Sequence, residues 1–122
     1  MKLRIRNNSV RIRLSRTEID TLGGIGHIED ATEFGTGTFR YSLWAKEGIG
    51  GLQASFEDGK ITMFVPIEFA KVWPENTVVG TANEVPLPGG GSLSLLLEKD
   101  FKCIDNVSED QSDNYENPNA VC

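Results

Sequence analysis

The sequence has few of the side chains that hold metals or act as catalytic nucleophiles and bases. Its 122 residues include two cysteines and one histidine. Disulfide scaffolds, zinc ribbons and metal sites built on His pairs need more of these residues, so the composition excludes their common forms. His27 has no cysteine or serine partner in a recognisable motif, and we interpret it as a surface or capping histidine. We therefore name no catalytic residue.

Long apolar runs are missing as well. None approaches the roughly 18 residues of a transmembrane helix. The opening MKLRIRNN alternates charged and uncharged residues and lacks the apolar centre of a signal peptide. We expect a soluble cytoplasmic protein without a membrane partner. A chain of 122 residues has the usual size of one domain and can bury a core without disulfides.

Charge is present but unevenly distributed. The net charge of −6 argues against nucleic acid as a partner. Residues 1–16, however, carry six bases and no acid, residues 17–97 carry four bases and eleven acids, and residues 98–122 carry two bases and seven acids. The basic beginning and the acidic end therefore deserve separate interpretation.

Alternating apolar and polar residues, interrupted by turn residues, predict an α+β fold with about seven to eight short strands and two short helices. We expect a single domain over residues 1–103, in which a mainly antiparallel sheet is curved or closed into a barrel-like shape. The acidic C-terminal tail, residues 104–122, has few core-forming residues, so we expect it to pack on that domain or to be flexibly attached. The strands are expected within residues 2–6, 10–14, 26–34, 38–46, 52–57, 60–65, 77–91 and 92–101.

Local motifs support these elements. Ser15 and Glu18 have the spacing of a capping box, and Gly23-Gly24 is expected to end that helix after about two turns. Residues 66–74 begin and end with proline and predict the second helix. The last strand is apolar enough to be central in the sheet. Aromatic residues at strand or helix spacing are core candidates, namely Phe39, Tyr41, Trp44, Phe69 and Trp73.

Two hairpins carry clear turn signals. Asn7-Asn8-Ser9 separates the first two strands, and Asp58-Gly59 separates two later ones. Within the first hairpin, strict alternation directs one set of side chains to the core, namely Leu3, Ile5, Val10, Ile12 and Leu14. The opposite face then carries five cations, Lys2, Arg4, Arg6, Arg11 and Arg13. We call these five residues the basic face.

Neighbouring like charges destabilise a strand pair by a few tenths of a kcal/mol or more, so a partner for the basic face is expected. Three partners are open. Solvent together with acids of the same chain, such as those of residues 27–34, is one. The acidic tail is another. The third is a small, phosphate-rich anionic ligand, because the planar fork of Arg binds phosphate or carboxylate through two hydrogen bonds.

The stretch CIDNVSEDQSDNYENPNAVC has a cysteine at each end, five acids and no base. Two thiolates, an imidazole and tail carboxylates would form a mixed sulfur, nitrogen and oxygen ligand set suited to zinc or iron. Two free thiols are the alternative, as is a disulfide, which a reducing cytosol disfavours. The candidate metal ligands are Cys103, Cys122, His27, Asp110 and Asp113.

A barrel whose first strands carry alternating bases resembles the triphosphate-tunnel hydrolases. In that family inward Lys and Arg bind polyphosphate and inward Glu residues hold magnesium, roles that the resemblance would assign here to Glu29 and Glu33. The family opens with the pattern ExExK, whereas this chain opens MKLRIR. The resemblance implies, as an alternative, a metal-dependent phosphohydrolase-like enzyme.

The two ends of the chain resemble a family of small bacterial proteins of unknown function. The resemblance lies in MKLRIRNNSVRIRLSRTEID, in EFG at residues 33–35 and in the ending DFKCIDNVSEDQSDNYENPNAVC. Members open like MKxRIxxNSxRxRLxxxE and end in an acidic segment of the form C…ED…D…NP…C. The resemblance brings no activity, but it implies that the acidic tail belongs to the protein's normal structure.

These observations favour a non-enzymatic binding or accessory domain over an enzyme. In this interpretation the basic face meets an anionic ligand or the protein's own acidic tail. A metal-binding protein or metal-dependent enzyme is the alternative.

Overall fold

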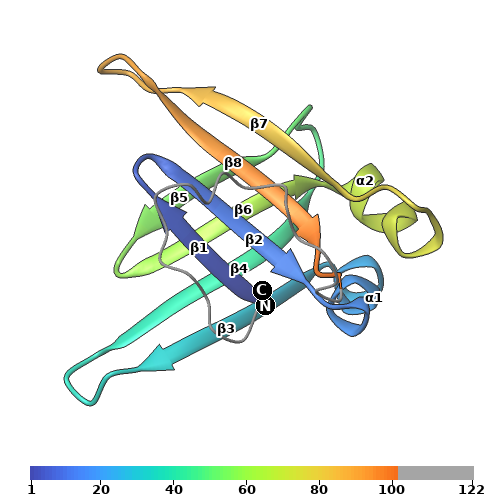
Figure 1. Ribbon diagram of the computed structural model, residues 1–122, viewed down its shortest axis with the longest axis horizontal. Coiled ribbons are helices and arrows are strands. Elements are labelled where there is room, and N and C mark those ends of the chain that lie inside the picture. Colours follow the sequence, from blue (N-terminus) through green and yellow to red (C-terminus); the bar gives the residue numbers. More distant parts are fainter. Residues whose placement is uncertain (102–122) are drawn as a thin grey trace, which may run out of the picture.

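The structure, a computed structural model, describes residues 1–101 (Figure 1). This part of the chain forms eight strands, two α-helices and a short 3-10 helix, in the order that the sequence predicts. The predicted tail, residues 104–122, lies outside the described residues. The elements are β1 (Lys2–Arg6), β2 (Ser9–Leu14), α1 (Arg16–Ile25), β3 (His27–Glu33), β4 (Thr38–Lys46), β5 (Gln53–Glu57), β6 (Lys60–Pro66), α2 (Ile67–Val72), η1 (Trp73–Glu75), β7 (Gly80–Pro86) and β8 (Ser92–Lys99).

The strands form two four-stranded sheets, ordered β1-β2-β8-β7 and β3-β4-β6-β5. Each sheet consists of two antiparallel hairpins whose second strands meet in the centre, and these central pairs, β2 with β8 and β4 with β6, are parallel. The α+β class is confirmed, as is the central place of β8. Most strand pairings are antiparallel, as expected, but each sheet is mixed because its central pair is parallel. The expectation of one sheet, curved or closed into a barrel-like shape, is wrong in its number and in its closure: there are two sheets, and neither closes into a barrel. Turn residues specify each hairpin locally, but they do not specify how one hairpin meets the next.

Two hairpin turns use backbone conformations that few residues tolerate. Asn7 has φ 50°, and Asp58 has φ 52° and is followed by Gly59 at φ 73°. Asn and Asp enter this left-handed region more readily than other side chains, and Gly enters it freely. Both predicted hairpins are therefore confirmed, with the turn chemistry that the sequence indicated.

Helix α1 begins where the sequence predicts and ends later. The Ser15 hydroxyl accepts a hydrogen bond from the Glu18 amide, and the Glu18 carboxylate accepts one from the Ser15 amide, which completes the capping box. The prediction that Gly23-Gly24 ends the helix is wrong, since both glycines lie inside it. The helix ends at Gly26, whose φ of 97° is the left-handed conformation of a C-terminal glycine cap.

Gly23 has a packing role instead. A Cβ atom at this position would lie 3.0 Å from the carbonyl oxygen of Ala70 in α2 and 3.0 Å from the Cγ of Pro74 in η1. The missing side chain therefore allows α1 to approach α2 and η1 closely. None of the helices within residues 1–101 is long and apolar enough to span a membrane.

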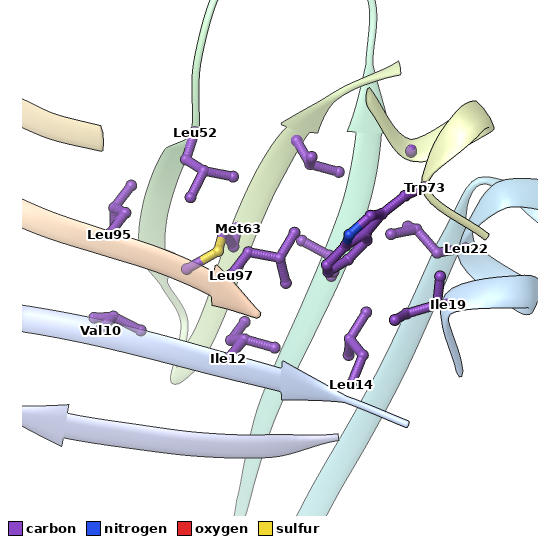
Figure 2. Packing of buried hydrophobic residues seen from close by; sticks show 13 residues of the cluster. Val10, Ile12, Leu14, Ile19, Leu22, Leu52, Met63, Trp73, Leu95 and Leu97 are labelled. Carbon is purple, nitrogen blue, oxygen red and sulfur yellow. The ribbon is translucent and has the colours of Figure 1, made fainter. Parts of the chain in front are cut away.

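The core lies between the inner faces of the two sheets, and the helices close it at one end (Figures 1 and 2). Trp73 is fully buried there, and its indole Nε1 donates a hydrogen bond to the carbonyl oxygen of Val78 at 2.7 Å. The buried apolar residues are Val10, Ile12, Leu14, Ile19, Leu22, Leu43, Leu52, Met63, Val65, Ala70, Trp73, Leu95 and Leu97.

The aromatic core candidates divide into two groups. Trp73 is buried, Phe69 packs against the core, and Phe39 and Tyr41 are half-buried on the inner side of β4. Trp44 is 39% exposed, so its assignment to the core is wrong. Strand β4 lies in the middle of its sheet, and alternation along the strand directs the Trp44 side chain to the outer face of that sheet.

Candidate anion-binding face

The basic face is assembled by the register of the first hairpin. The antiparallel pairing of β1 with β2 places Lys2 opposite Arg13 and Arg4 opposite Arg11, while Arg6 lies opposite Ser9. Opposite residues in such a pair have Cβ atoms about 5 Å apart and point to the same side of the sheet. The five cations are therefore close neighbours on one face, as the alternation predicts.

The opposite side of the same hairpin faces the core. Val10, Ile12 and Leu14 are buried there, and Leu3 packs against them. Ile5 shares this inner side but is 55% exposed, because it lies toward the turn, away from the helices that close the core. Burial of this apolar side places the cations on the outer side of the sheet, where Lys2 is exposed and Arg11 and Arg13 are half-buried.

Two carboxylates within residues 1–101 contact these cations, and they come from β8 and the residue that follows it. One oxygen of Glu98 lies 3.4 Å from the Nε atom of Arg11 and 3.4 Å from that of Arg13. The Nζ atom of Lys2 lies 2.6 Å from a carboxylate oxygen of Asp100. Both acids lie at the end of the face that carries Lys2 and Arg13.

Sequence reasoning missed both acids. It expected partners from residues 27–34, but Glu29 and Asp30 in that stretch bind other cations. Glu29 lies 3.1 Å from Lys60 on β6, and Asp30 lies 3.2 Å from the N-terminal ammonium. The apolar character of β8 signalled a central strand, but nothing in the sequence indicated that β2 would be its neighbour.

Away from the cations the same sheet face becomes polar. Ser94 on β8 lies opposite Ser9, and its hydroxyl donates to Glu84 on β7, as does the hydroxyl of Ser92. The hydrogen bond from Ser94, followed by that from Ser92, lowers the pKa of Glu84 below its usual value. Glu84 is therefore an anion held by hydroxyl groups, and it marks the acidic border of the face.

A second charged cluster lies at the N-terminus. The ammonium group of Met1 contacts the carboxylate of Glu18 and lies 3.2 Å from that of Asp30. Burial disfavours the ammonium form, but the hydrogen bonds and charges of Glu18 and Asp30 outweigh it and raise the pKa of the ammonium group. Burial likewise disfavours the Glu18 carboxylate, but hydrogen bonds from the ammonium group and from Ser15 outweigh that effect and lower its pKa. This cluster joins β1 to α1 and β3.

Of the residues proposed for a metal site, the structure describes only His27. His27 lies on the outer side of β3, where its ring stacks on Trp44 with centroids 4.3 Å apart. Within residues 1–101 no cluster of three or more His, Cys, Asp or Glu side chains could hold a metal ion. The metal hypothesis stays a prediction, because its other ligands lie outside the described residues, namely Cys103, Asp110, Asp113 and Cys122.

The fold does not support the resemblance to the tunnel hydrolases. Glu29 lies on the outer side of its sheet, beside Lys60 and Arg40. Glu33 accepts hydrogen bonds from the Gly35 amide and the Thr38 hydroxyl at the end of the strand. Both acids belong to the sheet that does not carry the basic face, and no closed barrel surrounds them.

A hollow of about 590 Å³ opens at the helical end, between α1, the segment after η1 and the end of β8. Its charged lining is mixed and includes two bases, Arg16 and Lys99, and two acids, Asp20 and Asp100. The Lys99 ammonium donates to the carbonyl oxygen of Asn76 at 2.6 Å, and Asp100 binds a lysine of the basic face. Because its charges balance, the hollow does not select an anion over a cation.

Comparison with known proteins agrees with the resemblance of the chain ends. A model of a family of unknown function, DUF7009, matches residues 1–119. Searches of the curated proteins and of the solved structures gave no match.

Proposed function

The chain belongs to DUF7009, a family of unknown function, and because this membership brings no activity we propose a function from the geometry of the basic face. The protein is a non-enzymatic domain that binds a phosphate-rich small anion on the outer side of β1 and β2. The observation that carries the proposal is the register that sets Arg4 opposite Arg11 and Lys2 opposite Arg13.

The chemistry of these side chains suits phosphate. Two guanidinium groups on adjacent strands, with Cβ atoms about 5 Å apart, can bind the same phosphate group from two sides. An anion between them also replaces the mutual repulsion of the cations with attraction. The face lies on the outer side of a sheet rather than in a pocket, so we expect rapid exchange and strong dependence on salt.

The side chains of this face favour binding over catalysis. The outward positions of β1 and β2 carry Lys, Arg and Ser residues. Lys and Arg side chains are hydrogen-bond donors without an acceptor, so they attract and orient an anion but offer no group to take a proton from it. The enzymatic alternative has no comparable support among residues 1–101.

Inorganic triphosphate is a suitable probe. We expect it to shift the backbone amide resonances of β1 and β2 in the full chain, with an affinity that falls several-fold between about 20 and about 200 mM salt. The double variant Arg4→Gln/Arg6→Gln should lose most of this binding. A matched control, Arg16→Gln/Lys71→Gln, removes the same charge from exposed helical positions and should retain the binding.

Equal losses in the two double variants would show that net charge alone attracts the anion, and would reject the site. The absence of triphosphate binding at low salt would also reject it, provided that a chain with a neutralised acidic tail gives the same result.

A further inference from the structure

We propose that the protein's own acidic segment, residues 103–122, is a tethered competitor that occupies the basic face and must leave before an external anion binds. This inference concerns regulation and rests on the proposed function for the identity of the site. It commits the open face of β1 and β2 to one intramolecular occupant. Three observations carry it: where the described chain ends, what its last acids do, and the charge of the segment that follows.

The described chain ends beside the basic face. Strand β8 runs parallel to β2 and pairs Lys99 with Leu14, and the Asp100 amide donates to the Leu14 carbonyl oxygen at 2.9 Å. Figure 1 shows β8 and β2 side by side with their ends at the helical side of the molecule. The described chain therefore ends one strand away from the strand that carries Arg13.

The last acids of the described chain already bind these cations. Glu98 lies between the guanidinium groups of Arg11 and Arg13, and Asp100 binds Lys2. We infer that the acids that follow along the chain continue this pairing on the same face. They number five, without a base among them, in residues 103–122: Asp105, Glu109, Asp110, Asp113 and Glu116.

The segment is long enough to cover the face. From Arg13 to Ser9 the face extends four positions along β2, or about 13 Å at about 3.3 Å per residue. The sixteen residues from Phe101 to Glu116 can reach about 50 Å when extended, so the acids can reach Arg6 even along an indirect path. The segment has few apolar residues, so charge is the dominant attraction.

A tethered competitor acts through effective concentration. In the proposed arrangement the covalent connection to β8 gives the acids an effective concentration at the face on the order of millimolar. The apparent affinity for an external anion equals the intrinsic affinity multiplied by the fraction of time that the face is uncovered. If the segment covers the face about nine-tenths of the time, the apparent affinity falls about tenfold.

The first test needs no external ligand. A tail-neutral variant of the full chain carries Asp105→Asn, Glu109→Gln, Asp110→Asn, Asp113→Asn and Glu116→Gln. At low salt we expect its amide resonances to differ from those of the wild type in β1 and β2, and we expect high salt to remove the difference. A synthetic peptide of residues 103–122, added to the tail-neutral chain, should move these resonances back toward the wild-type positions.

The control variant removes five acids from exposed positions elsewhere: Asp20→Asn, Glu47→Gln, Asp58→Asn, Glu68→Gln and Glu75→Gln. It has the same net charge as the tail-neutral chain, and we expect its resonances in β1 and β2 to match the wild type. Identical β1 and β2 resonances in wild-type and tail-neutral chains at low salt would overturn the inference.

The second test separates the inference from the proposed function. We expect inorganic triphosphate to bind the tail-neutral chain about tenfold more tightly than the wild type, and the control variant to show a much smaller gain. Equal triphosphate affinity in wild-type and tail-neutral chains overturns the inference and leaves the anion-binding function in place. Failure of the tail-neutral chain to bind triphosphate, with the ligand-free resonance change present, supports docking of the segment and overturns the proposed function.

Discussion

Glu98 of β8 lies opposite Arg13 of β2 in a parallel register, and one of its carboxylate oxygens is 3.4 Å from the Arg13 Nε atom. The same oxygen lies 3.4 Å from the Nε atom of Arg11, so a single carboxylate moderates two guanidinium groups. This acid reduces repulsion within the basic face, but it also reduces the attraction of that face for an external anion.

The variant Glu98→Gln should therefore separate stability from binding. We expect its free energy of unfolding to change by less than about 1 kcal/mol, because partly exposed ion pairs contribute little. Its affinity for inorganic triphosphate should rise several-fold, as a negative charge leaves the edge of the site. Titration followed by amide resonances, together with urea unfolding, measures both quantities.

Glu29→Gln is the matched control for that variant, because Glu29 also serves two cations, Lys60 and Arg40, on the other sheet. Its triphosphate affinity should equal that of the wild type. A gain as large as that of Glu98→Gln would mean that the position of the carboxylate is irrelevant.

Because Glu18 binds the N-terminal ammonium group, removing its charge should lower the free energy of unfolding. Gln at this position can still complete the capping box, so Glu18→Gln tests the charge rather than the cap. We expect a loss of about 1 to 2 kcal/mol in the free energy of unfolding. This is toward the lower end of the range of about 1.5 to 3 kcal/mol for hydrogen bonds to charged groups, because the Gln amide oxygen can still accept a hydrogen bond. Asp20→Asn, on the exposed side of the same helix, should change stability by less than about 0.5 kcal/mol.

The same contact predicts how stability depends on pH. Because the pKa of Glu18 is lowered in the folded state, its contribution is complete above its unfolded value of about 4.3 and is lost as the pH falls through the folded value. Because the pKa of the ammonium group is raised, its contribution is complete below about 7.7 and is lost as the pH rises through the folded value. Urea unfolding across pH should show the largest difference between wild type and Glu18→Gln between these limits. If the difference in stability stayed constant from about pH 3 to about pH 10, across the titration of both groups, the assignment would be contradicted.

Substitution of the two adjacent glycines of α1 by alanine should change stability in different directions. Ala at position 24 meets no atom within 4 Å and should stabilise the helix by roughly 0.5 to 1 kcal/mol. Ala at position 23 would lie 3.0 Å from the Ala70 carbonyl oxygen and should cancel that gain or destabilise the protein. Thermal unfolding of Gly23→Ala and Gly24→Ala compares them directly. Equal stabilisation by both would show that α1 and α2 can move apart without cost.

The two tryptophans predict different sensitivities to the same substitution. Trp73→Phe replaces a buried indole with a smaller ring and removes the hydrogen bond to Val78. We expect the free energy of unfolding to fall by about 2 to 4 kcal/mol. Trp44→Phe changes a side chain on the outer side of β4, and we expect a loss below about 1 kcal/mol. Urea unfolding of the two variants provides the comparison, and similar losses would argue against the assigned burial.

Features that depend on near neighbours in the chain could be predicted from the sequence. Alternation in the first hairpin assigned Lys2 and Arg11 to one face, and the register confirms that assignment. The capping box at Ser15 and the turn at Asp58 were also predictable, because a few adjacent side chains and backbone groups decide them.

Features that depend on distant segments required the tertiary structure. The parallel pairing of β2 with β8 brings Glu98 to the basic face, and no pattern within either strand encodes that meeting. Gly23 was predicted to end the helix because glycine often has that role. Its missing Cβ instead accommodates a second helix more than forty residues away in the chain. Local conformational preferences are properties of a few residues, whereas strand neighbours, sheet closure and close helix approach are decided by how the whole chain buries its apolar surface.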